Sequence, residues 1–255
     1  MRTLSPVDMH AHVDTRIAPE DAEALQALIF AATRSLDETE RALRRDDPGI
    51  IWGAGCHPGL PDAQEQFDSG RFARLITKTA YVSEIGIDGT SPVPMRTQRQ
   101  TLDSVLGILQ SAPRIASVHS YSATAEVLEN LAARPGAGTV LHWWRGTEEQ
   151  TQRAAALGCY FSVNPAMARY PDILRLIPPE RLLTETDHPF GDRAVRVRAQ
   201  PGNVTVAERA ISRVHGISHD EIRLTIWRNL LGLVTTVGCG LLLPRGVRLI
   251  LASVP

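Results

Sequence analysis

Short apolar runs alternate with longer stretches of helical pattern along most of the chain. Eight of these runs predict strands, at residues 7–12, 27–33, 50–56, 81–85, 115–119, 139–142, 159–163 and 182–186. Amphipathic stretches between them predict helices, at residues 71–79, 97–110, 123–133 and 148–157. The strand runs are continuous rather than alternating, which is typical of parallel strands buried on both faces. Eight strands separated by helices therefore predict an α/β fold that closes into a (β/α) barrel.

The second strand and the last quarter of the chain are the less regular parts of this pattern. Residues 27–33 can form a strand or continue a helix that begins at Pro19. Further along, residues 204–215 and 218–233 predict two closing helices. The expected N-cap residues of these two helices are Asn203 and Ser218.

The length and composition suit one domain. The 255 residues are 43% hydrophobic, which is enough for one large core. We therefore expect a single domain over residues 1–255, ending in an apolar extension at about 230–255. This extension is too apolar for a solvated tail. We favour its packing against the bottom of the barrel over its docking on a partner protein.

Two further features bear on the compartment. The longest apolar run, residues 230–243, is shorter than the roughly 20 residues that cross a bilayer, and no basic-then-apolar leader begins the chain. The three cysteines, Cys56, Cys159 and Cys239, lack the paired spacing of a disulfide framework or a zinc–thiolate cluster. We therefore expect a cytoplasmic protein that does not contact a membrane.

The net charge of −1 provides no global basic field for nucleic acid. Any attraction for phosphate must come from local groups, such as bound metal ions and arginines. Arg145, Arg169 and Arg193 follow predicted strands and can clamp phosphates, although each taken alone better fits a solvent-facing arginine. Trp143 and Trp144 follow the sixth strand and can stack on a base.

Metal-competent side chains stand at the carboxyl-terminal ends of five predicted strands. They are His10, His12, Glu84, His119, His142 and Asp187. In an α/β barrel these ends converge on one face, and active sites form there. Imidazole and carboxylate ligands without thiolates favour Zn, Mn or Mg. The pattern therefore predicts a metal centre with up to two divalent cations at the barrel mouth.

Each of these residue types has a chemical reason to be there and an ordinary alternative. His10 and His12 lie two apart on one strand, point to the same side and can bind one cation together. A buried Glu84 needs a metal or an arginine partner, and its two oxygens can bridge two cations. His119 and His142 can complete a second site, although each alone is more often a core histidine. Asp187 can bind a metal and accept a proton from water.

Two carboxylates lie beside this set. Asp8 can orient a ligand from behind or be a polar residue of the barrel wall. Glu185 can support the site in the same way or form a salt bridge at its strand end. The sequence alone does not choose between these roles.

The candidate residues and their separations resemble the TatD family of metal-dependent hydrolases and deoxyribonucleases. The matching blocks are DMHAHVD (8–14), GCHP (55–58), SEIGID (83–88), VHS (118–120), LH (141–142) and LTETD (183–187). The resemblance implies a TIM-like barrel that hydrolyses phosphodiester bonds of DNA with metal ions. It places one metal ion among His10, His12, Glu84 and Asp187, and a second among Glu84, His119 and His142. It also places His57 near the scissile phosphate, where the alternative is a loop histidine fixed by Pro58.

Residues 142–144 and 157–167 are more narrowly similar to the TatD-like component of Qat anti-phage defence systems. That similarity implies partner proteins of a defence complex. Three positions near the site depart from the family pattern, namely Gly89, Tyr121 and the pair Trp144-Arg145. These departures leave the ligand set intact and put the usual substrate preference in doubt.

The expected chemistry is hydrolysis by water that two cations activate, with Asp187, Glu84 and His57 as catalytic residues. A metal-dependent amidohydrolase or lactonase is the first alternative, because the same ligands can activate water against a carbonyl group. Lys78 falls in a predicted helix, so it does not suit the carboxylated bridging lysine of some amidohydrolases. A non-catalytic assembly subunit is the second alternative, and retention of all six ligand types argues against it.

Overall fold

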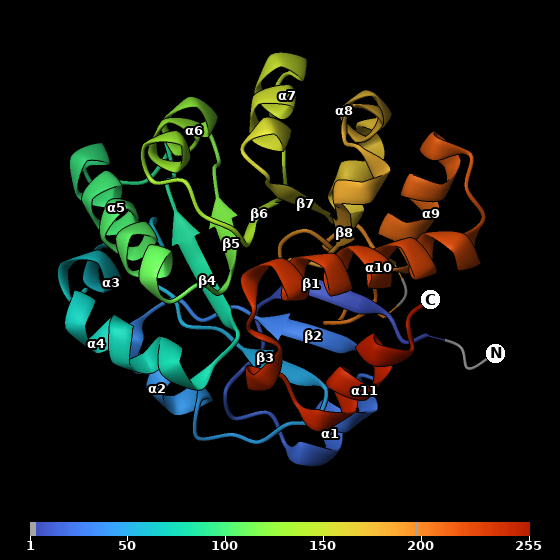
Figure 1. Ribbon diagram of the computed structural model, residues 1–255, viewed down its shortest axis with the longest axis horizontal. Coiled ribbons are helices and arrows are strands. Elements are labelled where there is room, and N and C mark those ends of the chain that lie inside the picture. The colour runs from blue at the N-terminus through green and yellow to red at the C-terminus, as the bar shows by residue number, and fades with distance from the viewer. Residues whose placement is uncertain (1–3, 197) are drawn as a thin grey trace.

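The computed structural model describes residues 4–196 and 198–255. Eight strands form its centre, and helices lie around them (Figure 1). The strands are β1 (Val7–Ala11), β2 (Leu28–Ala31), β3 (Ile50–Trp52), β4 (Tyr81–Gly86), β5 (Ile115–His119), β6 (Thr139–His142), β7 (Tyr160–Val163) and β8 (Leu182–Thr184). Neighbouring strands pair in parallel, in the order β1-β2-β3 and β4-β5-β6-β7-β8. The predicted TIM-like barrel is confirmed, and all eight predicted strands are present.

Residues 27–33, for which the sequence allowed either a strand or a helix, contain the strand β2. Residues Leu28–Ala31 are fully buried and pair with β1 on one side and β3 on the other. A helix does not form here because only an extended segment can form backbone hydrogen bonds with a strand on each side.

Two seams close the strands into a barrel. Between β3 and β4, the Ala54 amide donates to the Tyr81 carbonyl at 3.1 Å, and the Ser83 amide donates to the Ala54 carbonyl at 3.0 Å. A β-carbon on Gly55 would lie 1.9 Å from the Thr33 carbonyl oxygen, so the backbones approach too closely there for any other residue.

The second seam, between β8 and β1, relies on side chains as well as on backbone. The Thr184 hydroxyl donates to the Val7 carbonyl at 2.6 Å, and the Asp187 amide donates to the His10 carbonyl at 2.8 Å. This seam therefore ties the segment after β8 to the first predicted ligands on β1.

Helices and short 3-10 turns surround the strands (Figure 1). In chain order they are α1 (Pro19–Ala24), α2 (Leu36–Ala42), α3 (Pro61–Glu65), α4 (Ser69–Leu75), η1 (Ile76–Lys78), α5 (Met95–Ser111), α6 (Thr124–Ala133), α7 (Glu148–Ala156), η2 (Pro165–Arg169), α8 (Pro171–Leu176), η3 (Pro179–Arg181), α9 (Thr205–His215), α10 (His219–Val237), η4 (Gly240–Leu242) and α11 (Arg245–Ser253). The six predicted helices are confirmed, the first as α4 followed by η1. Within the described residues every helix is too short or too polar to span a bilayer.

The two predicted N-caps have different outcomes. Ser218 caps α10 and forms a capping box with Glu221. Asn203 is wrong as a cap, because Val204 occupies the position before α9 and no side chain caps that helix. The Asn203 amide instead donates to the Arg198 carbonyl at 2.9 Å.

The helix α10 covers the amino-terminal ends of the strands. Its Trp227 indole donates to the Ser5 carbonyl at 2.9 Å, and its Asn229 amide donates to the Leu182 carbonyl at 2.7 Å. The apolar extension continues this packing, since Leu243, Val247 and Leu251 are buried in the main core cluster. That shared core supports packing of the extension on its own barrel, and the single domain over residues 1–255 stays a prediction.

Candidate metal centre

The six predicted ligands converge on the carboxyl-terminal end of the barrel. His10 lies on β1 and His12 directly after it, Glu84 lies on β4, His119 and His142 end β5 and β6, and Asp187 follows β8. All but His12 and His119 are buried, and those two are partly buried. The structure thus brings together residues that are up to 177 positions apart in the sequence, as the barrel prediction requires, and their role as ligands stays a prediction.

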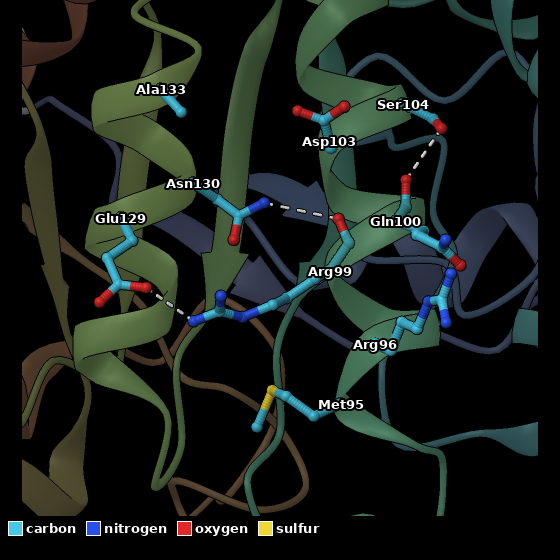
Figure 2. Close-up of a pocket in the computed structure, with 9 residues that line it drawn as sticks. All are labelled: Met95, Arg96, Arg99, Gln100, Asp103, Ser104, Glu129, Asn130 and Ala133. Atoms are coloured by element: carbon cyan, nitrogen blue, oxygen red, sulfur yellow. Dashed lines mark hydrogen bonds and ion pairs between the residues drawn. The ribbon is translucent and has the colours of Figure 1, made fainter.

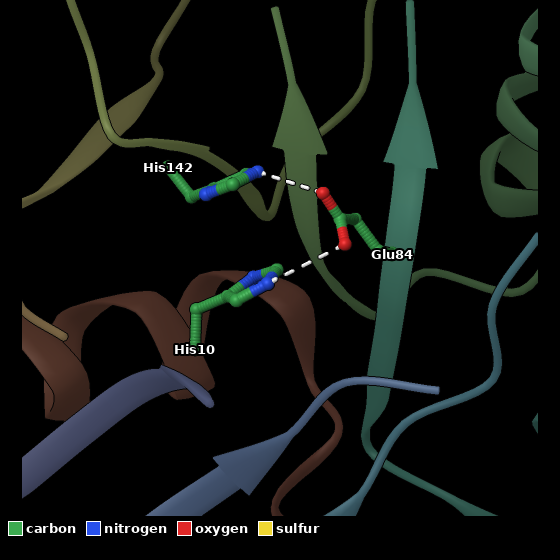
Figure 3. A group of neighbouring side chains, drawn as sticks. All are labelled: His10, Glu84 and His142. Atoms are coloured by element: carbon green, nitrogen blue, oxygen red, sulfur yellow. Dashed lines mark hydrogen bonds and ion pairs between the residues drawn. The ribbon is translucent and has the colours of Figure 1, made fainter. Parts of the chain in front are cut away.

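Glu84 occupies the centre of the cluster and is only 2% exposed. One carboxylate oxygen, Oε1, accepts hydrogen bonds from His119 Nδ1 at 2.7 Å and from His142 Nε2 at 3.1 Å. The other oxygen, Oε2, lies 3.7 Å from His10 Nε2 and 3.5 Å from His12 Nε2. Figure 3 shows the carboxylate beside the rings of His10 and His142, with one oxygen toward each ring, and the ring centroids are 4.1 Å apart in a stacked arrangement.

Asp187 faces the cluster from the segment after β8. Its Oδ1 lies 3.9 Å from His10 Nε2 and 3.7 Å from His12 Nε2. The backbone adopts a left-handed conformation there, with a φ of 44°, which is uncommon for a residue with a side chain. Hydrogen bonds from the amides of Phe190 and Gly191 to the Asp187 carbonyl hold this turn. Such local strain is typical of functional sites.

The donor atoms fit divalent cations. Separations of 3.5–3.9 Å around Glu84 Oε2 and Asp187 Oδ1 are too long for hydrogen bonds. Among the described residues, His10 Nε2 and Glu84 Oε2 are buried without a hydrogen-bond partner. Each such orphaned atom costs roughly 1–3 kcal/mol. A cation among these atoms would remove that cost.

Three overlapping groups can each hold an ion, because their donor atoms lie within 4.8 Å of one another. The groups are His10, His12 and Asp187; His10, Glu84 and His142; and His57, Glu84 and His119. Glu84 and His10 are shared between groups. The overlap supports a centre for more than one ion.

A hydrogen bond behind His10 sets its orientation. The Nδ1 atom lies 2.7 Å from Ser117 Oγ and 3.3 Å from Ser83 Oγ. When Nδ1–H donates to the serine, the lone pair of Nε2 points at the cluster, as a metal ligand requires. Ser117 precedes His119 by two positions on β5 and so faces the same side, and this spacing is the signal by which the sequence could have located it.

Asp8 links β1 to the segment after β8. Among the described residues, its hydrogen bonds reach no side chain of a predicted ligand. Its carboxylate accepts hydrogen bonds from the amide and hydroxyl of Thr186 at 2.8 and 2.7 Å and from the Gly202 amide at 2.7 Å. Burial raises the pKa of Asp8 to about 6 despite these bonds. The residue therefore supports Asp187 through the backbone.

Glu185 lies behind His142. It is fully buried and accepts hydrogen bonds from the Trp143 amide at 2.9 Å, from Asn164 Nδ2 at 3.0 Å and from the Ser162 hydroxyl. Burial, with the Asp8 charge adding to it, raises the pKa of Glu185 well above its usual value. Its Oε1 is 3.9 Å from His142 Nδ1. Glu185 thus joins the loops after β6 and β7, and it lies beside the ring of His142, whose pKa is lowered by burial.

The imidazoles fall into two electrostatic classes. Burial lowers the pKa of His10 and of His12 to about 4, so both rings are neutral near pH 7. Burial also disfavours the charged form of His119, but Asp88 and Glu84 outweigh it and raise the pKa of His119 to about 9. Asp88, whose Oδ2 lies 3.4 Å from His119 Nε2, was not predicted as a partner of the site.

The two central carboxyl groups are shifted in opposite directions. Burial opposes the charge on Glu84, yet the surrounding imidazoles, His57 first among them, hold its pKa well below the usual range. Burial and the charges of Glu185 and Glu84 raise the pKa of Asp187 well above its usual value. Asp187 is therefore the carboxyl group suited to hold a proton.

His57 reaches the cluster from the loop after β3. Its Nδ1 accepts a hydrogen bond from the Gly59 amide at 2.9 Å, and its Nε2 lies 3.4 Å from Glu84 Oε2. A neutral ring with this partner carries its proton on Nε2. His57 thus presents an N–H donor to the site, and Gly59 fixes the ring.

The aromatic and cationic residues predicted near the mouth are only partly as expected. Arg145 and Arg193 are exposed on loops after β6 and β8, as is Arg169 at the end of η2. Trp144 is fully buried and donates to Thr151 Oγ1 at 2.8 Å, so its predicted stacking on a base is wrong. The chain turns at Trp143, where φ is 45°, and Trp144 packs inward.

A groove lies away from this cluster, between α5 and α6 (Figure 2). An ion pair between Arg99 and Glu129, at 2.7 Å, spans it. The groove contains no predicted ligand, so we assign it no part in the site.

Comparisons with known proteins identify the family and the fold of the chain. A family model described as TatD related DNase matches residues 7–234. A putative deoxyribonuclease tatdn3 from Danio rerio is 24% identical over 89% of the chain and 96% of that protein, and tatdn3-B from Xenopus laevis is 29% identical over 87% and 91%. The crystal structure of YJJV, a TatD homologue from Escherichia coli K12, superposes with a TM-score of 0.79 at 22% identity, over 89% of the chain and 96% of that structure.

Proposed function

The chain belongs to the TatD related DNase family, and from this premise we propose that it hydrolyses phosphodiester bonds of DNA with two divalent cations at the barrel mouth. The observation that carries the proposal is the convergence of four imidazoles and two carboxylates, with buried donor atoms that lack partners. Membership of the family makes the chain a metal-dependent hydrolase. The number of cations, their identity as Zn, Mn or Mg, and the mechanism are our proposals.

The donor set divides between two ions. His10, His12, Glu84 and Asp187 would hold one, and Glu84, His119 and His142 would hold the other. When bound, such cations lower the pKa of water and offset negative charge on phosphoryl oxygens. Glu84 suits the bridging position because its two oxygens face different pairs of imidazoles.

The protein groups around the ions move and hold protons. Asp187 takes the proton of the attacking water, since its carboxylate faces the cluster from the segment after β8. His57 donates a hydrogen bond from its Nε2–H to a phosphoryl oxygen, because Gly59 occupies Nδ1, and Asp187 passes its proton on to the leaving oxygen. Ser117 keeps the Nε2 lone pair of His10 directed at the site.

The decisive assay compares substrates on purified, metal-loaded protein. Single-stranded DNA, duplex DNA, RNA and a panel of small esters and lactones are tested with the natural chain and with His119→Ala. We expect DNA cleavage that His119→Ala abolishes and that His219→Ala, a histidine of α10 outside the cluster, leaves intact. Turnover of esters or lactones alone would establish the carbonyl alternative. A folded protein that binds no Zn, Mn or Mg and gains no thermal stability from them would be an assembly subunit.

The role in anti-phage defence, with partner proteins of a Qat-like complex, is a finer proposal. It is supported only by the residues at 142–144 and 157–167. We expect plaque counts to fall in cells that express the chain with its neighbouring genes and to recover with His119→Ala. Equal plaque counts in both strains would remove this proposal and leave the nuclease assignment untouched. The cytoplasmic location likewise stays a prediction, supported by three buried free cysteines.

A further inference from the structure

Exposed aromatic side chains gather at the mouth of the barrel. Among the described residues, the exposed large apolar side chains are Leu60, Tyr121, Tyr170, Phe190, Leu241 and Leu249. The first four lie on loops that follow β3, β5, β7 and β8. These loops are at the same end of the barrel as the proposed metal centre. Exposed aromatic rings have a hydration cost, so a cluster beside a site points to a ligand.

Phe190 connects this cluster to the proposed ligands. Its ring is 43% exposed and makes an edge contact with the His12 ring, with centroids 5.5 Å apart. Its amide donates to the Asp187 carbonyl at 2.6 Å, so its position depends on the turn that aims Asp187. The Arg193 guanidinium lies over the Phe190 ring, 5.0 Å from its centroid.

Tyr170 repeats this arrangement on the neighbouring loop. Its ring is 39% exposed, and the Arg145 guanidinium lies 4.6 Å from its centroid. A hydrogen bond of 3.0 Å from the Ala166 amide to the Gly191 carbonyl joins the loop that carries Tyr170 to the loop that carries Phe190. The two arginine–aromatic pairs therefore belong to one connected rim.

The two arginines retain free hydrogen-bond donors. Arg71 and Arg99 are paired with carboxylates at 2.6–2.8 Å, whereas Arg145 and Arg193 pair with no carboxylate in the described part of the chain. A guanidinium that stacks on a ring keeps its N–H edge available, and that edge matches a phosphate. Exposed rings with adjacent arginines are the elements with which proteins bind unpaired nucleic acid.

We propose that Tyr170 with Arg145 and Phe190 with Arg193 form an arginine–aromatic rim that holds nucleotides of an unpaired strand beside the metal centre. Bases stack on the two rings, and the guanidinium groups bind the phosphates that flank the scissile bond. A paired strand covers its base faces with its own neighbours, so the rim favours a single strand. The inference rests on the proposed nuclease function and adds its substrate subsite.

The test uses the metal-loaded full chain and two oligonucleotides of equal length. One is single-stranded DNA, and the other is the same strand with abasic tetrahydrofuran residues, which keep the phosphates and lack the bases. We expect Phe190→Ala and Tyr170→Ala each to lower kcat/KM on the natural strand by about 10-fold or more. The kcat/KM on the abasic strand should change little in these variants, and Phe190→Trp should restore cleavage of the natural strand. Leu249→Ala, an exposed apolar residue of α11, is the matched control and should change neither.

The outcomes separate the rim from the metal centre. An equal loss on both strands would mean that Phe190→Ala disturbs His12 or Asp187, and it would overturn the rim. Unchanged rates on both strands would overturn it as well. No cleavage of any nucleic acid by the natural chain would refute the proposed function. Fluorescence anisotropy of the labelled strands then still tests the rim, because it measures binding without a cut.

The arginines have a separate signature in salt. Arg145→Gln and Arg193→Gln should each reduce the slope of log binding constant against log salt by about 0.7 for a single strand. An unchanged slope would show that the guanidinium groups bind no phosphate and only pack on the rings. Arg175→Gln, whose side chain pairs with Asp172, serves as the control.

Discussion

The two halves of the proposed metal centre differ in how they are prepared for a cation. In the half formed by His10, His12 and Asp187, donor atoms face one another across 3.7–3.9 Å with no hydrogen bond to break. In the half formed by His119 and His142, both imidazoles already donate to Glu84, at 2.7 and 3.1 Å. An ion entering the first half fills a gap, whereas an ion entering the second must displace hydrogen bonds.

The two halves also differ in the protonation of one imidazole, His119, whereas burial lowers the pKa of His142 in the second half as it does for His10 and His12 in the first. The imidazoles of the first half are neutral, with pKa values of about 4, and its carboxyl group, Asp187, has a raised pKa. In the second half the imidazole of His119 is protonated below a pKa of about 9, held by Asp88 and Glu84. The comparison implies unequal affinities, with tighter binding in the first half, and different dependences on pH.

Removing the charge that both halves share should have the largest effect. Glu84→Gln keeps the shape of the side chain and removes the charge that faces the four imidazoles of the proposed ligands. We expect kcat/KM on DNA to fall by about a thousandfold or more, since each 1.4 kcal/mol of lost transition-state stabilisation costs tenfold. Metal analysis should find fewer than one ion per chain. Glu126→Gln on α6 is the control, and a Glu84→Gln protein that keeps two ions would contradict the shared position.

Removing one histidine from each half separates the two positions. His119→Asn should leave one tightly bound ion, because the first half keeps all its donors. His12→Asn should weaken the binding of both ions, since it removes a ligand from the first half, which we expect to fill first. Activity should fall by about 100-fold or more in each, because both ions act on the same phosphate. Isothermal titration with Mn²⁺ measures both affinities, and identical titrations of the two variants would refute the inequality.

The sequence predicted the framework of this centre better than its details. Continuous apolar runs located all eight strands, and the strand ends located the six candidate ligands, because a parallel barrel brings its carboxyl-terminal ends together. The contact of Asp88 with His119 and the positions of Tyr170 and Phe190 depend on loop turns, for which apolar periodicity carries no signal. Trp144 was misassigned for the same reason, since the turn at Trp143 directs its ring into the core.

The hydrogen bond behind His10 should have an intermediate effect. Ser117→Ala removes the 2.7 Å partner of Nδ1 and frees the ring to change tautomer. Such supporting partners are worth about 10–100-fold in metal affinity. Competition with a chelator should therefore show a loss in the first half of the centre, while the second half changes less. Ser104→Ala, an exposed serine of α5, is the control. Equal weakening of both ions would show that Ser117 acts on packing rather than on His10.

The dependence on pH should be the smallest and most diagnostic difference. Below a pKa of about 9, a cation that binds at His119 must displace its proton, so affinity for the second ion should rise about tenfold per pH unit between pH 7 and 9. The neutral His10 and His12 add no such slope in this range. Asp88→Asn removes the carboxylate that does most to raise the pKa of His119, so the rise of second-ion affinity with pH should become flatter.

The pH dependence of the stability of the metal-free protein is an independent test of the proton on His119. The pKa of His119 is higher in the folded chain than its unfolded value near 6.5, so its stabilising contribution is complete below pH 6.5 and is lost as the pH rises through about 9. Chelator-treated protein should therefore unfold more readily at pH 9 than at pH 7, and His119→Asn should reduce that difference. A natural chain whose second-ion affinity is the same at pH 7 and pH 9 would show that His119 binds without losing a proton. The distinction between the two halves would then rest on the displaced hydrogen bonds alone.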